Sequence, residues 1–360
     1  MSTRSTFFNP ILIGPIAVLI SLWILKPLAA RLRLLDHPGG RKIHASPTPV
    51  IGGIALFIGF TVALLCDGQF SQEIKALWFF SALILFIGVT DDRHGLSARM
   101  RLLVQTLVAS GLVLISNIRI ETFGHVLLDF LVNSHVFSLV FTVLVIIAFI
   151  NAINMLDGLD GLVGGIALGE GFLLWLLSCR LMSSLQQILS VFLCLMLVFL
   201  VFNVPFFKGK QARVFLGDAG STFIAFFLVC AGIMLSQHTQ ETSITPITIL
   251  WCLLFPFMDL LSVCIIRKCI GKPCFQAGHE HIHHLLIRNG LSRHLVSAVL
   301  CLFSLSLGLI GLVLAWLQVS ENVQLILLLM LISYYLLATF RIYKREVTVT
   351  STTCLDGTSY

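Results

Sequence analysis

The sequence predicts an all-α, polytopic integral membrane protein with about eleven transmembrane helices. Of its 360 residues, 58% are apolar and only 11% are charged, and the mean hydropathy is +1.00. A soluble protein of this length could not bury so many apolar side chains in its core. Runs of about 20 apolar residues match the thickness of a bilayer. The expected spans are approximately residues 9–30, 50–66, 76–90, 102–117, 136–153, 162–178, 185–206, 221–236, 245–266, 295–317 and 323–340.

The first of these runs is expected to remain in the protein as a transmembrane helix. Small residues near its end, Leu28, Ala29 and Ala30, faintly resemble a signal-peptide cleavage site. Basic residues follow them at once and many further spans come later, which favours a retained helix. The ten cysteines lie mostly inside apolar runs and form no CxxC pair, so we expect small buried thiols and not disulfides.

The positive charges divide unevenly between the two sides of an eleven-span arrangement. Eighteen of the 23 Lys and Arg residues fall in one set of loops and in the C-terminal tail. The positive-inside rule makes this side cytoplasmic and puts the N-terminus outside. We expect one integral-membrane domain over residues 1–345, followed by a short polar cytoplasmic tail over residues 346–360.

Acidic residues gather on the same side of this arrangement. They are Asp36, Asp91, Asp92, Asp157, Asp160 and Asp218. A transporter would instead place ionisable groups along a path across the membrane. The one-sided cluster therefore favours a site at the cytoplasmic face, and a transporter is the less favoured alternative.

The stretch NAINMLDGLDGLVGG, residues 151–165, is the richest in candidate functional groups. Asn151, Asn154 and Asp157 recur every three residues and would share roughly one face of a helix. Asp160 continues this stripe with some drift, and the glycines argue against a continuous helix. Carboxylate and amide oxygens suit a hard cation such as Mg²⁺ and the hydroxyls or ring edges of a nucleotide. A structural polar loop is the alternative, but Ser, Lys or Gly would serve that purpose.

The loop TDDRHGLSARMR, residues 90–101, contains the adjacent carboxylates Asp91 and Asp92. On a helix they would point about 100° apart. We therefore expect one to act as a base or metal-side ligand and the other to be oriented elsewhere. Arg101 suits a lipid phosphate or pyrophosphate. The alternative is a helix N-terminus whose dipole the two acids complement.

Two other cytoplasmic loops carry candidate substrate-binding residues. In the first loop, Arg41 and Lys42 could meet phosphates, although a positive-inside anchor explains them equally well. In the loop RVFLGDAGST, Asp218 lies between two glycines, in a turn where backbone N–H groups could approach a phosphate. Phe215 is an aromatic residue in an otherwise polar loop, and it suits stacking on a nucleobase.

The loop GHEHIHHLLIRNG matches the HExxH pattern of zinc proteases from His279 to His283. That motif belongs on a helix inside a protease fold, whereas this one lies on a basic loop that faces acids. Zinc binding is therefore the less favoured alternative. We expect His281, His283, His284 and Arg288 to contact phosphate and sugar groups.

Five motifs, taken in order, resemble the polyprenyl-phosphate N-acetylhexosamine-1-phosphate transferases. They are LLDHPGGRKIH with TPVIGG, DDR with LS, NAINMLDGLDGL, VFLGDAGS and HIHHLL, and they extend from about residue 34 to residue 293. The HIHH form resembles the WecA-like branch, whereas the MurNAc-pentapeptide branch usually has three consecutive histidines. Many relatives have DDxxD in the second loop. Gly95 takes the last position here, so a third carboxylate cannot act there.

The resemblance implies an enzyme that transfers GlcNAc-1-phosphate from UDP-GlcNAc to undecaprenyl phosphate in the bacterial inner membrane. UMP would leave, and the product would be the first lipid-linked sugar of a cell-surface polysaccharide such as O-antigen. The resemblance also implies Mg²⁺ as cofactor, with Mn²⁺ as a substitute, and no nucleic-acid partner. The alternatives are another UDP-N-acetylhexosamine, including UDP-MurNAc-pentapeptide, and, outside this class, a transporter. A homodimer is left open.

The resemblance assigns roles to individual residues as well. Asn154 and Asp218 match metal ligands, Asp160 matches the contact to the uracil edge, and Phe215 would stack on the ring. Asp91 matches the residue proposed to deprotonate or position the lipid phosphate. Whether Asp157 is a covalent nucleophile or an organiser of the site stays open. The other candidates are Asp92, His283 and His284 as catalytic residues, and Asn151, Arg41, Lys42, Arg101, His281 and Arg288 as substrate-binding residues.

Overall fold

The described part of the protein is almost wholly helical. The computed structural model describes residues 9–36, 47–68, 71–116, 118–127, 129–132, 134–179, 184–205, 211–237, 244–273, 278 and 280–355. Its helices are α1 (Pro10–Leu28), α2 (Gly52–Asp67), α3 (Gln72–His94), α4 (Ala98–Ile115), α5 (His135–Leu156), α6 (Leu162–Ser178), α7 (Ser184–Asn203), α8 (Gly217–Gln237), α9 (Pro246–Cys252), α10 (Leu254–Cys269), α11 (Ile282–Arg288), α12 (Arg293–Trp316) and α13 (Glu321–Leu355). A two-residue antiparallel ribbon, β1 (Leu35–Asp36) with β2 (Thr48–Pro49), and a 3₁₀ turn, Asp129–Leu131, are the remaining elements. The all-α prediction is confirmed.

Eight of the described helices are long and apolar enough to cross a membrane, and the pair α9–α10 can make a ninth span. The helices α2 and α6 are apolar but have only 16 and 17 residues. With a rise of about 1.5 Å per residue they reach about 25 Å, less than the roughly 30 Å hydrocarbon core of a typical bilayer. The chain is therefore a multi-pass membrane protein. A total of eleven transmembrane helices additionally requires α2 and α6 to cross the membrane, and this total stays a prediction.

The helix expected over residues 245–266 is broken, because α9 and α10 meet at an angle of 73°. The break falls at Leu253, which caps α9 and precedes α10. Pro256 explains it in part, since proline lacks the N–H that would bond to the carbonyl of Cys252 in a continuous helix. At the other end of the chain, α13 continues to Leu355, beyond the residue where we expected the membrane domain to end.

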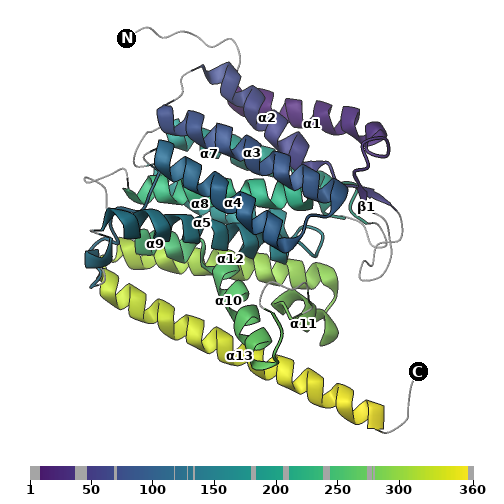
Figure 1. Ribbon diagram of the computed structural model, residues 1–360, viewed down its shortest axis with the longest axis vertical. Helices are drawn as coiled ribbons and strands as arrows, with labels where there is room; N and C mark the ends of the chain where they lie inside the picture. The colour runs from purple at the N-terminus through teal and green to yellow at the C-terminus, as the bar shows by residue number, and fades with distance from the viewer. Residues whose placement is uncertain are drawn as a thin grey trace.

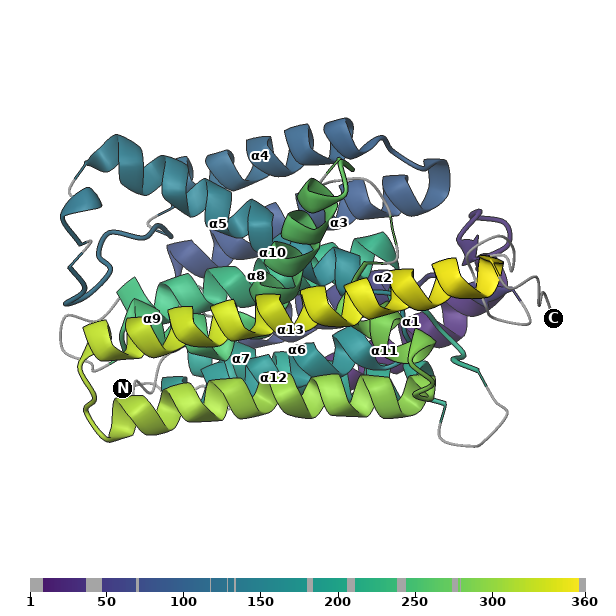
Figure 2. The ribbon, with the colours of Figure 1, turned by 90° about the horizontal axis from the view of Figure 1, so that it is seen from below.

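The helix α8 lies in the centre of the bundle, with α2, α3, α5 and α6 packed around it (Figures 1 and 2). Every residue from Ala219 to Ser236 is buried. Aromatic side chains fill the contacts around it: the ring of Phe227 lies 4.6 Å from that of Phe192 and 5.4 Å from that of Phe60, between centroids. A helix that is apolar on all sides is expected to be buried in this way.

Glycines bring two neighbouring helices into backbone contact with the start of α8. A Cβ atom added to Gly88 of α3 would lie 2.3 Å from the Cα of Ala219, and one added to Gly53 of α2 would lie 2.3 Å from the N of Gly220. Because no real Cβ contact is so short, only glycine permits these approaches. The close packing sets the last turn of α3, which carries the adjacent acids, against the first turn of α8.

The loops that carry the candidate residues lie at one end of the bundle. Figure 1 shows β1 and α11 at this end, together with the C-terminal end of α13. An isolated parallel bridge joins Val50, after β2, to Phe215, before α8, so two loops far apart in the sequence meet there. The helix α10 crosses the other helices steeply, and α13 packs against it. This end therefore holds the candidate site.

Candidate active site

Asp92, in the last turn of α3, holds the first turn of α8. Its Oδ1 accepts a hydrogen bond from the backbone N–H of Asp218 at 2.8 Å, and its Oδ2 accepts one from Ala219 at 3.0 Å. The N–H groups at the start of a helix lack partners within the helix, so a carboxylate satisfies them and complements the helix dipole. A Cβ on Gly217, whose φ is +76°, would lie 2.6 Å from the Asp92 carboxylate. Only glycine allows this close approach.

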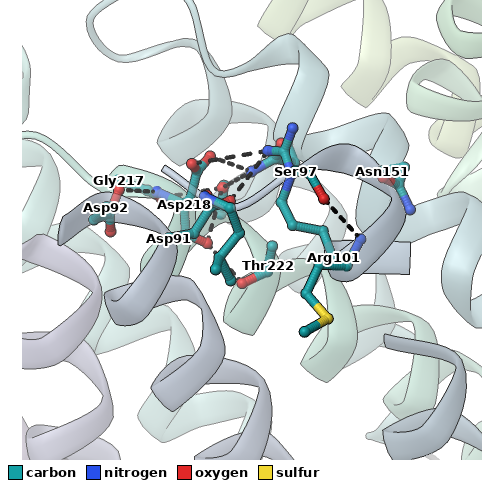
Figure 3. Close-up of polar contacts among 12 residues, drawn as sticks. Asp91, Asp92, Ser97, Arg101, Asn151, Gly217, Asp218 and Thr222 are labelled. Carbon is teal, nitrogen blue, oxygen red and sulfur yellow. Dashed lines mark hydrogen bonds and ion pairs between the residues drawn. The ribbon is translucent and has the colours of Figure 1, made fainter. Parts of the chain in front are cut away.

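Asp91 points to a different set of partners. Its Oδ1 accepts the backbone N–H of Leu96 at 2.6 Å, and its Oδ2 lies 3.2 Å from Nη1 of Arg101. The same guanidinium nitrogen lies 3.9 Å from Oδ2 of Asp218. Figure 3 shows Arg101 reaching toward Asp91 and Asp218, with Asp92 turned to the backbone at the start of α8. The expectation that the adjacent acids have different tasks agrees with this geometry.

Asn154, in the last turn of α5, joins the acidic cluster, whereas Asn151 faces another helix. The Nδ2 of Asn154 donates to Oδ1 of Asp218 at 2.7 Å and to Oγ of Ser221 at 3.0 Å. The Nδ2 of Asn151 donates to Oε1 of Gln105 on α4 at 2.8 Å. The two amides of the expected stripe therefore have separate partners, and only Asn154 contacts a carboxylate of the cluster.

Asp157 follows α5 and is exposed to solvent at its surface. Desolvation by the surrounding protein and the charges of Asp218, Asp92 and Asp160 raise its pKa to about 8. Part of the carboxyl remains in contact with water, which stabilises its ionised form and so reduces the upward shift of the pKa. Desolvation and the three neighbouring carboxylates act in the same direction, so the pKa of Asp157 lies above its ordinary value in the ligand-free protein.

The segment that carries Asp160 is a turn and not a continuation of the helix, as the glycines of the sequence indicated. Gly161 has a φ of +77°, a conformation that favours glycine. Its N–H donates to Oδ1 of Asn203 at 2.8 Å, and Nδ2 of Asn203 donates to the carbonyl of Val214 at 3.0 Å. Asp160 accepts the N–H of Ala212 at 3.3 Å. The acidic turn is thereby attached to the loop before α8.

Phe215 is held by the backbone of the first loop. Its N–H donates to the carbonyl of Pro49 at 2.9 Å, and its carbonyl accepts the N–H of Gly52 at 3.0 Å. The side chain is half-buried. Arg41 and Lys42, the candidates from the same first loop, lie outside the described residues.

His283 is the histidine that the structure places directly against the acidic turn. It is buried, and a Cβ on Gly158 would lie 2.8 Å from its Nε2. Between ring centroids, His284 lies 4.1 Å and His281 lies 5.7 Å from His283. The candidate histidines therefore form one group beside Asp157.

The segment before α11 does not support a zinc protease. Glu280, which would be the general base of an HExxH site, is paired with Arg267 and Lys272, each at 3.1 Å. Burial alone would raise the pKa of Glu280, but hydrogen bonds from Lys272 and Arg267 hold it below its usual range. Among the described residues, no three His, Cys, Asp or Glu side chains are grouped as metal ligands. Arg288, at the end of α11, is exposed.

An apolar groove of about 500 Å³ lies between α4, α5 and α10 and is open to the outside of the bundle. Asn151 contributes to its wall and is one turn from Asn154, which bonds to Asp218. The groove therefore extends along the apolar flank of the bundle as far as Asn151. Its lining includes Leu102, Thr106, Val143, Ile147, Leu260 and Cys264.

The acidic cluster has the chemistry of a site for a hard cation. Asp91 and Asp218 face each other with one guanidinium, that of Arg101, between them. The amide of Asn154 adds a further polar group to Asp218. Small oxygen donors with an excess of negative charge are what Mg²⁺ prefers. The residues present therefore fit this ion.

Several polar residues of the site were missed from the sequence, namely Gln105, Asn203, Ser221, Ser297 and Asp259. Ser297 donates to the carbonyl of Asp160 at 3.1 Å, and the others bond to candidate residues or to the loops that carry them. A usable signal existed, because an amide or carboxylate inside an apolar run is costly in a membrane unless it has a partner.

Comparison with known proteins identifies the family of the chain. A model of glycosyl transferase family 4 matches residues 74–236. Proteins from Haemophilus influenzae and Yersinia pestis are 35% and 30% identical to this chain, over 76% and 81% of it and over 77% and 80% of their own lengths. A protein of Escherichia coli strain K12 is 28% identical over 87% of this chain and 86% of its own. All three are named undecaprenyl-phosphate alpha-N-acetylglucosaminyl 1-phosphate transferase. The chain therefore belongs to glycosyl transferase family 4 and, within it, to the polyprenyl-phosphate N-acetylhexosamine-1-phosphate transferases.

Proposed function

We propose that the protein transfers GlcNAc-1-phosphate from UDP-GlcNAc to undecaprenyl phosphate and releases UMP. The names of its relatives support this assignment. The structural observation that carries it is an apolar groove whose wall includes Asn151, one turn from Asn154, which bonds to Asp218 of the carboxylate cluster. A long lipid with a phosphate head needs the groove, and a metal-bound diphosphate needs the cluster. The product would begin a cell-surface polysaccharide such as O-antigen.

The groove suits the polyprenyl chain of the acceptor. Its wall includes Asn151, which is bonded to Gln105 of α4. Arg101 lies one turn before Gln105 and so projects from the same face of α4. A lipid in the groove would bring its phosphate toward Arg101, whose planar guanidinium can bind two phosphate oxygens at once. Asp91, paired with Arg101, then lies beside the nucleophile.

Mg²⁺ would be held by Asp218 together with the amide oxygen of Asn154. When bound, it would neutralise charge on the diphosphate as the bond to UMP breaks. Nδ2 of Asn154 faces Asp218 in the ligand-free protein, and a rotation of the amide group would present its oxygen instead. Mn²⁺, with similar ligand preferences, would substitute.

The nucleotide would bind between the acidic turn and the loop before α8. Asn203 bonds to both segments, so it fixes the backbone next to Asp160 relative to the backbone next to Phe215. Phe215 would stack on uracil, and the carboxylate of Asp160 would accept a hydrogen bond from the edge of the base. Arg41, Lys42 and Arg288 remain candidates for phosphate contacts.

In the chemical step, an oxygen of the lipid phosphate attacks the β-phosphorus and the bond to the UMP oxygen breaks. A phosphate monoester has a second pKa near about 6, so it needs little help from a base at neutral pH. We infer that Asp91 holds the nucleophilic oxygen in line and completes deprotonation. Asp92, which is engaged by the start of α8, acts by placing Asp218.

A covalent mechanism through Asp157 is the rival for this step. A raised pKa makes the carboxyl of Asp157 a weaker nucleophile near neutral pH, and this favours direct attack by the lipid phosphate. The two mechanisms differ before lipid is added. With UDP-GlcNAc alone, a covalent mechanism releases one UMP per site, and direct attack releases none.

The orientation that the charges predict places the site at the cytoplasmic face. A cysteine introduced at Thr239 should then react with an impermeant thiol reagent on whole cells, and one introduced at Gln211 should not. The eight described cysteines are free thiols, so both variants are compared with the unmodified protein under the same conditions. The reverse labelling pattern would overturn the orientation.

The function is tested by an assay of purified protein for UMP release. Release should require both a polyprenyl phosphate and Mg²⁺. The same assay with UDP-MurNAc-pentapeptide and other UDP-N-acetylhexosamines tests the rival donors, among which UDP-GlcNAc should give the highest kcat/KM. Uptake of substrate into vesicles without UMP release would instead indicate a transporter.

A further inference from the structure

A buried polar chain connects α13 to the candidate histidines from outside the acidic cluster. At its centre is Asp259 of α10, which is 0% exposed. Its Oδ2 lies 2.7 Å from Nδ1 of His281, while its Oδ1 accepts the N–H of Ile282 at 3.1 Å and the hydroxyl of Tyr335 at 3.2 Å. Tyr335 belongs to α13 and is buried.

The carboxylate of Asp259 determines which nitrogen of His281 carries the proton. An ionised carboxylate only accepts hydrogen bonds, and Ile282 and Tyr335 both donate to it. Nδ1 of His281 must therefore be the protonated nitrogen in this contact. The ring is fixed in both tautomer and orientation, as in sites where a carboxylate orients a functional histidine.

His281 in turn contacts the histidine beside the acidic turn. The rings of His281 and His283 are stacked, with an interplanar angle of 23°. His283 fills the space beside Gly158, next to Asp157. A rotation of His281 would therefore displace His283 relative to Asp157 and the reacting phosphates.

A second anchor on α10 holds the same segment. Glu280 precedes His281 and pairs with Arg267, which is 1% exposed, and with Lys272. The backbone around His281 is thus fastened from the end of α10 even without Asp259. The pairs of Glu280 therefore hold the segment in place, whereas Asp259 sets the orientation of the His281 ring.

We propose that Asp259 and Tyr335 are positioning residues of the transfer reaction. Tyr335 fixes the carboxylate of Asp259, which orients His281, and His281 holds His283 against the turn at Asp157. Burying a carboxylate and a tyrosine hydroxyl among apolar helices is costly, and apolar residues of similar volume would stabilise the bundle equally. Stability alone therefore does not explain these two polar side chains. The inference rests on the proposed function only for its kinetic test.

The matched test uses two neighbouring tyrosines of α13. Tyr335→Phe removes the hydroxyl that donates to Asp259, and Tyr334→Phe removes one from a side chain that is 72% exposed. Tyr335→Phe should lower kcat for UMP release about tenfold and leave the KM for UDP-GlcNAc unchanged, because Phe215 and Asp160 are untouched. Tyr334→Phe should match the unmodified enzyme.

Asp259→Asn makes the stronger change in the same chain. Its amide oxygen can still accept from Ile282 and Tyr335, but its NH₂ group then faces Nδ1 of His281, which must give up its proton to the other nitrogen. The value of kcat should fall about a hundredfold. The melting temperature should change less than in Arg267→Ala, which removes the structural anchor.

A measurement that needs no activity separates this inference from the proposed function. Deuterium exchange at the C2 carbon of histidine, followed by mass spectrometry, reports the surroundings of His281 and His283. Both Asp259→Asn and Tyr335→Phe should exchange faster there than Tyr334→Phe. Equal exchange in all three would overturn the inference even if UMP is released normally. If the exchange rates differ as expected but the unmodified protein releases no UMP, the positioning inference stands and the proposed function is wrong. Equal kcat values for Tyr335→Phe and Tyr334→Phe would also overturn the inference that Tyr335 is a positioning residue.

Discussion

The carboxylate of Asp92 holds the backbone N–H of Asp218 at 2.8 Å, so an acid at the end of α3 positions an acid at the start of α8. Asp91, its neighbour, instead faces Arg101. Two adjacent carboxylates thus have separate partners: Asp92 holds the backbone of Asp218, the proposed metal ligand, and Asp91 pairs with Arg101, the proposed contact of the acceptor phosphate. The contact also connects the second and fourth cytoplasmic loops of the expected topology.

Asp91→Asn and Asp92→Asn should differ in kind. Asp91→Asn should depress kcat strongly, leave the KM for UDP-GlcNAc nearly unchanged, and be partly relieved at higher pH, because the phosphate then ionises fully without help. Asp92→Asn keeps one accepting oxygen but places its NH₂ group against the second backbone N–H, which should cost about 1–2 kcal/mol of stability and also weaken Mg²⁺ activation. Steady-state kinetics and thermal unfolding check both. Identical kinetic and thermal profiles would refute the division of tasks.

Asp218→Asn should remove a carboxylate that we propose as a ligand of Mg²⁺. Activity should fall at least about a hundredfold while the protein inserts and purifies normally, and the Mg²⁺ concentration for half-maximal rate should rise. Glu121→Gln, a change of the same kind at an exposed residue paired with Arg119, is the control. Retained activity with an unchanged Mg²⁺ requirement would remove Asp218 from the metal site.

Phe215→Ala should weaken nucleotide binding. Stacking of a base on an aromatic ring is worth about 1–3 kcal/mol, so the KM for UDP-GlcNAc should rise about five- to a hundredfold. Phe215→Trp, which keeps an aromatic face, should preserve most of the binding. If the Ala and Trp variants behave alike, the ring packs against protein and the stacking role is wrong.

Asp157→Asn should change the pH dependence of stability. The folded protein raises the pKa of Asp157 to about 8, against about 3.9 for an ordinary Asp. The folded state therefore binds this proton more tightly, and the resulting stability is fully present below about pH 4 and is lost as the pH rises through about 8. Asn stays neutral at every pH.

The melting temperature of Asp157→Asn relative to the unmodified, metal-free protein should accordingly increase from about pH 5 to about pH 8 and then level off. Asp67→Asn, at an acid outside the cluster that is bonded to Gln187, should show no such trend. A difference that stays constant across this range would contradict the raised pKa.

The sequence predicted the helical class and the residues of the acidic cluster because both are local signals. The length of an apolar run and the side on which charges fall can be read without knowing which helices touch. The glycines after Asp157 likewise indicated the end of α5, and Gly161 has a positive φ there.

Partners between helices could not be read in this way. Asn151 and Asn154 share a helix face, but α4 and α8 pack on either side of it, so one amide meets Gln105 and the other meets Asp218. The role of Asp259 depends on a bend of 73° between α9 and α10, which turns its helix toward the histidines. Tertiary packing decides both, and a single sequence does not contain it.

In the proposed reaction, a sugar and its phosphate move together to the lipid. The most direct measurement uses UDP-GlcNAc labelled both in the sugar and in the β-phosphate, with undecaprenyl phosphate, Mg²⁺ and purified protein. Both labels should enter the lipid extract in equal amounts while unlabelled UMP appears in the aqueous phase. Transfer of the sugar label alone, with labelled UDP left in the water, would contradict it.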